Sequence, residues 1–218
     1  MKLFIYGAGG KGKEDYDLIM RSKSLRDKYA FIYFIDDFQE EESFYGTQRI
    51  RFSSCYKYIE NDSVEFVIAV GEPSARKMLW DKVVSNGYTV TTLIDDSAIV
   101  SNTAIIEPGC IVEAGAIISS DVVLKENAIV MYNAIVGHDA VVGNNTVICP
   151  RANVGGNSIV GEQCFIGISS SIMQKVNVGD RAIVGMGAMA FRDIEQGSTV
   201  IGNPARVTKG NVEHKVFK

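Results

Sequence analysis

The chain has 218 residues, of which 46% are hydrophobic and 22% are charged. It carries 22 Lys and Arg against 26 Asp and Glu, which gives a formal net charge of −4. This composition is typical of a globular protein with one large or two small domains, and nothing in the bulk charge favours a nucleic-acid partner, so none is expected.

Membrane and secreted classes are also disfavoured. No segment approaches the run of about 18 to 20 apolar residues that spans a membrane. The apolar run in the opening MKLFIYGAGGKGKEDYD is too short for a signal peptide. The cysteines show no metal-binding spacing, so we expect reduced thiols in a cytoplasmic protein. They are Cys55, Cys110, Cys149 and Cys164.

Strand and helix patterns alternate along the first 95 residues. Apolar strands are predicted at KLFIYG (2–7), AFIYFID (30–36), VEFVIAVG (64–71) and TVTTLI (89–94). Helices are predicted at KEDYDLIMRS (13–22) and PSARKMLWDKVVSNG (73–87). This alternation predicts an α/β domain over residues 1–95, built on a small Rossmann-like parallel sheet.

The glycines after the first strand, Gly7-x-Gly9-x-x-Gly12, match the dinucleotide fingerprint. Only one such unit precedes the next domain, which is too little for a complete two-half dinucleotide fold and argues against NAD. Such glycines also let a diphosphate approach a helix N-terminus. Asp36 or Asp37, at the end of the second strand, is placed to accept hydrogen bonds from a ribose or a uracil ring. The alternative is a tight turn followed by a capped loop.

A six-residue repeat dominates the rest of the chain. Fifteen hexapeptides run from Ile99 to Ala188, and the second position is Val, Ile or Leu in all fifteen. A period of six fits neither a helix nor an alternating strand, but it fits a coil with one short strand on each of three faces. The repeat therefore predicts a left-handed parallel β-helix within residues 96–218, with five coils about 4.8 Å apart. Glycine, third in seven units, is expected to ease corners of positive φ.

Four motifs then narrow the family. VIGNPARVTKG follows the last coil, and IYGAGGKGKE, FIDDF and VIAVGEPSARK lie in the first domain. Together with the repeat they resemble bacterial hexapeptide-repeat sugar acetyltransferases, a family that includes sialic acid O-acetyltransferases and UDP-4-amino-sugar N-acetyltransferases of the bacillosamine pathway. The resemblance implies acetyl-CoA as co-substrate, a UDP-sugar acceptor in glycan biosynthesis, and a homotrimer. It implies these acceptor-binding residues: Gly7, Gly9, Gly10, Lys11, Gly12, Asp36, Asp37 and Gly71.

His138 is one of only two histidines and occupies the fourth place of IVGHDA. A surface histidine without a role is the alternative, but acyl transfer needs a base that titrates near neutrality. The resemblance makes His138 the general base, Asp139 its orienting partner, and the Gly156 amide an oxyanion donor. It also implies CoA contacts at Gly156, Ile168, Gly185, Met186 and Gly187. His214 is expected to be an ordinary exposed residue.

Departures from the family leave the acceptor open. Val147 replaces a second histidine of some members, Met131 replaces an asparagine, and Lys11 replaces a histidine. The adjacent carboxylates of FIDDF and the single histidine base favour transfer of the acetyl group to an amine of a UDP-sugar. The stretch GEPSARK is instead close to the equivalent stretch of sialic acid O-acetyltransferases, so transfer to a sugar hydroxyl is the alternative. A non-catalytic scaffold would leave the His-Asp pair unexplained. A metal enzyme of the γ-carbonic anhydrase type needs three histidines, so no metal is expected.

Overall fold

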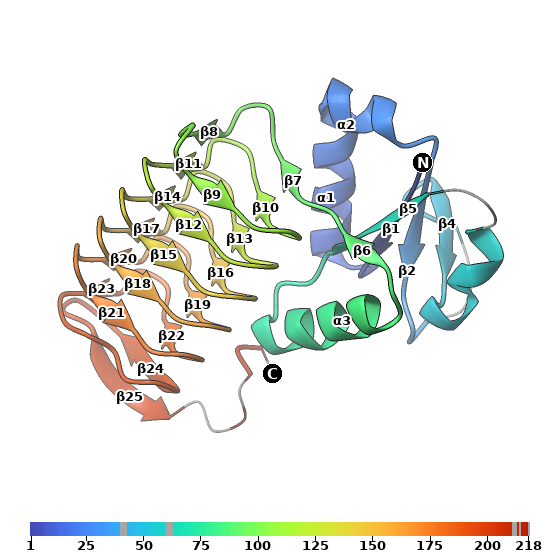
Figure 1. Ribbon diagram of the computed structural model, residues 1–218. Coiled ribbons are helices and arrows are strands. Elements are labelled where there is room, and N and C mark those ends of the chain that lie inside the picture. The colour runs from blue at the N-terminus through green and yellow to red at the C-terminus, as the bar shows by residue number, and fades with distance from the viewer. Residues whose placement is uncertain (40–42, 60–62, 211–212, 214, 218) are drawn as a thin grey trace. The chain divides into compact units, whose positions relative to one another are not determined.

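The computed structural model describes residues 1–39, 43–59, 63–210, 213 and 215–217. The chain divides into two compact units (Figure 1). The first contains residues 1–71 and 78–91, and the second contains residues 72–77 and 92–218. No helix in these described ranges is long and apolar enough to cross a membrane.

The first unit is an α/β sheet, as the alternating pattern predicts. Its strands lie in the order β3-β4-β2-β1-β5-β6, and all neighbours pair in parallel except β3 and β4. The strands are β1 (Lys2–Tyr6), β2 (Phe31–Ile35), β3 (Ser43–Phe44), β4 (Thr47–Ile50), β5 (Val64–Ile68) and β6 (Thr89–Val90). The helices are α1 (Gly10–Arg21), α2 (Lys23–Lys28), a 3-10 helix (Phe52–Tyr58) and α3 (Pro73–Ser85).

The order of these strands defines where a ligand would bind. From β1 the chain runs outward through β2 and β4, then returns to place β5 on the other side of β1. A reversal of this kind opens a crevice at the carboxyl ends of the strands. Gly7 follows β1, Asp36 follows β2 and Gly71 lies three residues beyond β5. Three of the residues expected to bind the acceptor therefore share this edge of the sheet.

The second unit is a three-sided prism of stacked coils, which confirms the predicted β-helix (Figure 1). Each strand of the repeat pairs in parallel with the strand 18 residues later, so three hexapeptides make one coil. The strands, β7 to β23, are Leu93–Ile94, Ile99–Val100, Ile105–Ile106, Ile111–Val112, Ile117–Ile118, Val123–Leu124, Ile129–Val130, Ile135–Val136, Val141–Val142, Val147–Ile148, Asn153–Val154, Ile159–Val160, Phe165–Ile166, Ser171–Ile172, Asn177–Val178, Ile183–Val184 and Met189–Ala190. An antiparallel pair, β24 (Ser198–Ile201) and β25 (Arg206–Gly210), follows the last coil.

The prism has three faces, each formed by one sheet. The first face contains β7, β10, β13, β16, β19, β22, β24 and β25; the second contains β8, β11, β14, β17, β20 and β23; the third contains β9, β12, β15, β18 and β21. Aliphatic side chains of the second hexapeptide position, such as Val112, Leu124 and Val136, are fully buried and form the core. The obligate aliphatic column is thus the interior of the prism.

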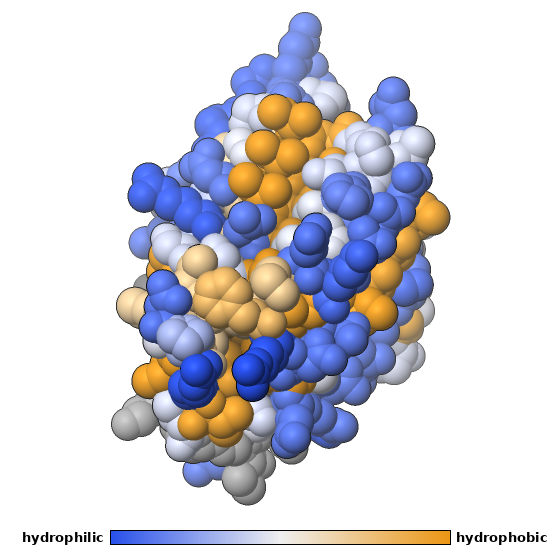
Figure 2. Space-filling model, turned by 90° about the vertical axis from the view of Figure 1, so that its left-hand side faces the viewer, coloured by the Kyte–Doolittle hydropathy of each residue, from blue (hydrophilic) through white to orange (hydrophobic). Residues whose placement is uncertain are grey.

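The outward side chains differ from face to face. On the first face, Ile111 and Ile129 are fully buried. On the second and third faces, Ile99 is 63% and Ile105 is 58% exposed. Figure 2 views the side on which β8, β11 and β14 lie in Figure 1, and it shows hydrophobic side chains gathered along it between polar ones. Two faces of the prism therefore present apolar surface.

The repeat glycines serve a different purpose from the one expected. None of the seven third-position glycines has a positive φ. A methyl group at Gly137 would lie 2.7 Å from the amide nitrogen of Gly156 in the next coil, and one at Gly143 would lie 2.5 Å from Gly161. The third position is glycine because adjacent coils are too close there for a side chain. Positive φ occurs instead at the fifth position, as at Asp139 (58°) and Asn157 (60°), where Asn, Asp and Gly are tolerated best.

Candidate active site

His138 lies in the turn that joins β14 on the second face to β15 on the third face. The same corner in the next three coils carries Gly156, Gln174 and Arg192 at the corresponding fourth position. The coils are tied together here, since the amide of Asn157 donates to the carbonyl of His138 at 2.8 Å. These four residues form a column along the prism, called the histidine column below.

The imidazole of His138 has one nitrogen engaged and one nitrogen available. Its Nδ1 lies 2.8 Å from Asp139 Oδ2, and Asn157 Nδ2 lies 3.5 Å from the same nitrogen. The side chains of His138 and Asp139 are 64% and 52% exposed. When Asp139 accepts the Nδ1 proton, the lone pair is at Nε2, which is the nitrogen that can take a proton from a substrate. The structure therefore brings together the predicted base and its predicted orienting carboxylate.

Gly156 lies directly beneath the ring. A methyl group at this residue would be 2.8 Å from His138 Nε2 and 2.9 Å from Cε1. The carbonyl of Gly156 accepts a hydrogen bond from the Lys175 amide at 2.9 Å. Its own N–H has no hydrogen-bond acceptor among the described residues. The residue packed under His138 Nε2 thus carries an amide donor without an acceptor among the described residues, as the predicted oxyanion role requires.

The residues predicted to contact CoA lie at a different corner. Ile168 and Met186 occupy the turns between the first and second faces and are 48% and 77% exposed. The amide of Gly187 donates to the carbonyl of Ile168 at 2.9 Å, which stacks these turns in successive coils. A methyl group at Gly185 would lie 2.6 Å from Ile201 Cγ2, so this glycine is required for packing. The second face separates this corner from the histidine column.

The fingerprint glycines divide into packed and open positions. A methyl group at Gly7 (φ +126°) would lie 2.4 Å from Ala69 O, and one at Gly12 would lie 2.0 Å from Gly7 O. Nothing lies within 4 Å of a methyl group at Gly9 or Gly10. The α1 helix starts at this open stretch, and no side chain caps its first turn. Gly7 and Gly12 therefore form a tight turn, and the same stretch leaves the N-terminus of α1 accessible to a ligand.

The two aspartates of FIDDF have different surroundings. Asp37 accepts hydrogen bonds from Lys82 Nζ (2.6 Å), from the Phe52 amide (2.9 Å) and from the Tyr6 hydroxyl. Burial alone would raise the pKa of Asp37, but the bonds from Lys82 and Tyr6 lower it below its ordinary value. Asp36 instead accepts from the Phe38 amide at 2.9 Å within its own turn. Lys11 forms an ion pair with Asp15 one turn along α1.

Sequence reasoning did not identify Lys82 or Tyr6, because nothing in the local pattern shows that α3 and β1 converge on Asp37.

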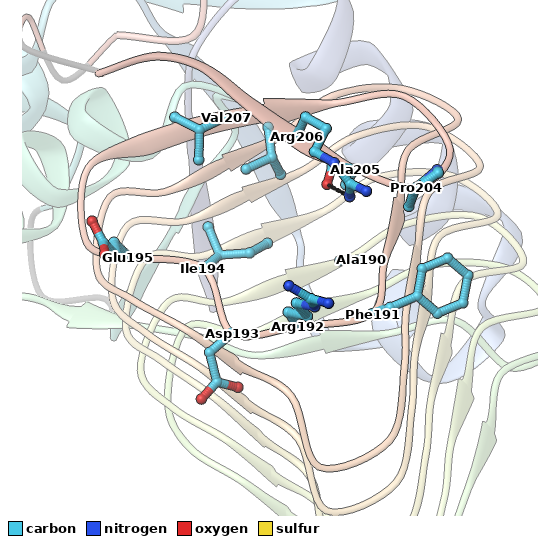
Figure 3. Close-up of a pocket in the computed structure, with 11 residues that line it drawn as sticks. Ala190, Phe191, Arg192, Asp193, Ile194, Glu195, Pro204, Ala205, Arg206 and Val207 are labelled. Carbon is cyan, nitrogen blue, oxygen red and sulfur yellow. Dashed lines mark hydrogen bonds between the residues drawn. The ribbon is translucent and has the colours of Figure 1, made fainter.

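The sequence also gives no sign of a cavity of about 550 Å³ at the C-terminal end of the prism (Figure 3). The cavity lies between the turn after β23 and the β24–β25 pair. It is lined by Ala190, Phe191, Arg192, Asp193, Ile194, Glu195, Val200, Pro204, Ala205, Arg206 and Val207.

The described part of the chain shows no cluster suited to a metal ion and no reactive thiol in the prism. Within the described ranges, no group of three His, Cys, Asp or Glu could hold a metal ion. The three cysteines of the prism are buried, and burial raises the pKa of Cys110, Cys149 and Cys164 to about 12. They are protonated and unreactive at neutral pH. His214 lies outside the described residues.

Known proteins share this architecture. Residues 2–83 match the family model described as the PglD N-terminal domain. The acetyltransferase domain of PglB from Neisseria gonorrhoeae, solved in complex with acetyl coenzyme A, is 32% identical, with a TM-score of 0.87 over 95% of this chain and 98% of that one.

Two further structures share the fold at lower identity. A perosamine N-acetyltransferase variant from Caulobacter crescentus, in complex with CoA and GDP-perosamine, is 24% identical with a TM-score of 0.88, over 96% of this chain and 97% of that one. WeeI from Acinetobacter baumannii is 24% identical with a TM-score of 0.85, over 95% and 100%. On the match to the PglB domain along nearly its whole length, the chain belongs to the PglD-like family of hexapeptide-repeat sugar acetyltransferases.

Proposed function

We propose that this protein transfers the acetyl group of acetyl-CoA to the amino group of a UDP-linked amino sugar, with His138 as general base. The observation that carries the proposal is the His138–Asp139 pair at 2.8 Å, with Nε2 directed over Gly156. The match to an acetyltransferase domain that binds acetyl coenzyme A supports the donor.

The reaction follows from this geometry. The neutral amine attacks the thioester carbonyl, and its carbon–nitrogen bond forms as the carbonyl oxygen becomes an oxyanion. The Gly156 N–H, which has no acceptor among the described residues, stabilises that charge. His138 Nε2 takes the proton that the nitrogen loses, and Asp139 stabilises the imidazolium. Collapse of the intermediate breaks the carbon–sulfur bond, and the CoA thiolate leaves with the proton held by His138.

The path of CoA can be proposed from the histidine column. With the thioester at His138, an arm that runs along the column passes Gly156 and reaches Arg192 three coils later, at about 14 Å. Arg192 and Arg206 both line the cavity at the end of the prism, where they are suited to bind phosphate groups (Figure 3). The CoA nucleotide would lie there.

A homotrimer would complete this site. The exposed apolar side chains on the second and third faces, such as Ile99, Ile105, Ile135 and Ile159, call for a partner surface. Three prisms about a threefold axis would bury them in closed symmetry. The corner with Ile168 and Met186 of one prism would then supply the remaining CoA contacts to the histidine column of its neighbour. Sedimentation should give three times the monomer mass; a fully active monomer would contradict this arrangement.

The acceptor would bind at the carboxyl edge of the first unit's sheet. The open stretch at Gly9 and Gly10 lies at the start of α1, and the backbone amides of a helix N-terminus stabilise a diphosphate. Asp36 is the better candidate for the ribose or uracil contact, because Asp37 already accepts hydrogen bonds from three groups. Lys11 and Gly71 belong to the same proposed site. Both substrates and the four unpaired cysteines fit a cytoplasmic enzyme.

A panel of acceptors tests this function. Release of free CoA from acetyl-CoA is followed with a UDP-amino sugar, a GDP-amino sugar and a sialic acid in parallel, and His138→Ala serves as the control. We expect release only with the UDP-amino sugar and only with His138 present. Release with sialic acid alone would favour the O-acetyltransferase reading. No release with any acceptor would contradict the proposal.

A further inference from the structure

The C-terminal tail contacts Glu72, the residue immediately before α3. The Glu72 carboxylate accepts hydrogen bonds from the backbone N–H of Val216, at 2.9 and 3.2 Å from its two oxygens, and from that of Phe217 at 3.0 Å. All three residues belong to the second unit. Bonds from amides to an ionised carboxylate are among the stronger hydrogen bonds in proteins.

A second contact secures the tail. The ring of Phe217 packs edge-on against Phe165, with centroids 5.5 Å apart and an angle of 87° between the rings. Phe165 begins its hexapeptide, and it is the only aromatic residue at that position in the fifteen units. Three other units begin with a polar residue, but only this unit places an aromatic ring there, and it lies where the tail docks. The tail is therefore held at two points, by its backbone bonds to Glu72 and by the ring contact with Phe165.

The segment that starts at Glu72 is also anchored at its other end. Arg76 is fully buried, and its Nε and Nη2 donate to the carbonyl of Asn127 at 3.0 and 2.7 Å. The side-chain amide of Asn127 donates to Asn145 Oδ1 at 2.8 Å and to the carbonyl of Arg76 at 3.2 Å. Residues 72 to 76 are held to the prism at both ends.

This anchored segment directly follows the loop after β5. Gly71 precedes Glu72, and the same loop touches the fingerprint turn, since a methyl group at Gly7 would lie 2.4 Å from Ala69 O and 3.0 Å from Val70 Cγ1. Movement of residue 72 would therefore disturb both turns that form the proposed acceptor site. His138 lies at the corner between the second and third faces, whereas Phe165, on which the tail docks, lies on the first face.

We propose that Glu72 is a positioning residue for the acceptor, and that Val216 and Phe217 form a strap that holds it in place. The role of the strap rests on the proposed function, because the acceptor site is part of that proposal. It requires no contact between Glu72 and the substrate. The strap fixes the loop through Gly71, and it should affect binding of the nucleotide sugar without affecting acetyl-CoA.

The test uses full-length Glu72→Ala and Phe217→Ala, with Glu162→Ala as the matched control, an exposed carboxylate elsewhere on the prism. We expect KM for the UDP-amino sugar to rise by about fivefold or more, the lower end of coupling between separate sites. KM for acetyl-CoA and kcat should stay within about twofold of the wild type. An unchanged KM for the nucleotide sugar, or an equal loss in all three constants, would overturn the proposal.

Hydrogen exchange separates failure of the strap from failure of the proposed function. Both variants should accelerate exchange of the amides at residues 74 to 77, whereas the control should not. If the wild type does not acetylate the UDP-amino sugar, the proposed function fails, and the exchange data decide on the strap. Unchanged exchange in Glu72→Ala and Phe217→Ala would show that the tail holds nothing in place.

Discussion

Gly156→Ala should impair catalysis without weakening the fold. Its methyl group would lie 2.8 Å from His138 Nε2, so the ring must move by about 0.7 Å to reach ordinary van der Waals separation. The ring is free to move because the His138 side chain is 64% exposed. A misplacement of this size should lower kcat by about 10- to 100-fold. The backbone of Gly156 has no positive φ, so alanine should leave Tm unchanged or raise it by a few degrees at most, about 2 to 4 °C.

Gly155→Ala is the matched control for this prediction. A methyl group there would lie 2.4 Å from the amide nitrogen and 2.8 Å from the Cα of Gln174, and that backbone cannot rotate away. We expect a loss of stability of about 1 to 3 kcal/mol. Steady-state kinetics and thermal unfolding of both variants check the pair. Normal turnover in Gly156→Ala, or a Tm as low as that of Gly155→Ala, would refute the packing of the ring on Gly156.

Four further variants test other parts of the site. His138→Ala should lower kcat by about two to four orders of magnitude, with little change in KM for acetyl-CoA, and Asp139→Asn should cost less; unimpaired turnover would remove His138 from the mechanism. Arg192→Ala should raise KM for acetyl-CoA but not for acetyl-pantetheine, which lacks the nucleotide; equal effects on both donors would count against the proposed CoA path. The pKa of Asp37 is lowered in the fold, so its ion pair stabilises the protein above pH about 4, and this contribution is lost as the pH falls through the lowered pKa. Asp37→Asn should therefore be less stable than the wild type in denaturant titrations at pH 7, and the difference should narrow as the pH is lowered below about 4; a difference that does not narrow would contradict the assignment.

The prism could be predicted from the sequence because its contacts recur at a fixed spacing. A residue and its neighbour in the next coil are always 18 positions apart, so an aliphatic second position in every hexapeptide identifies the core. The same regularity places His138 and Gly156 in one column. The reason for the third-position glycines was missed, since close backbone packing and positive φ both select glycine and only coordinates distinguish them.

Features that depend on irregular long-range contacts could not be predicted. The pairing of Asp37 with Lys82 joins residues 45 positions apart, and that of Arg76 with Asn127 joins residues 51 apart. Neither follows a repeat or a local motif. The docking of Phe217 on Phe165 has one trace in the sequence, the aromatic residue in an otherwise non-aromatic position. The aromatic residue at this position predicts a contact only when the course of the tail is known.

The most direct test of the central claim is the structure of the product. The enzyme is incubated with acetyl-CoA and a UDP-4-amino-4,6-dideoxy sugar, and the product is characterised by mass spectrometry and NMR. We predict a single added acetyl group, joined through an amide bond to the sugar nitrogen, and its absence with His138→Ala. An unmodified amine, together with acetylation of a sialic acid hydroxyl under the same conditions, would contradict the proposed function.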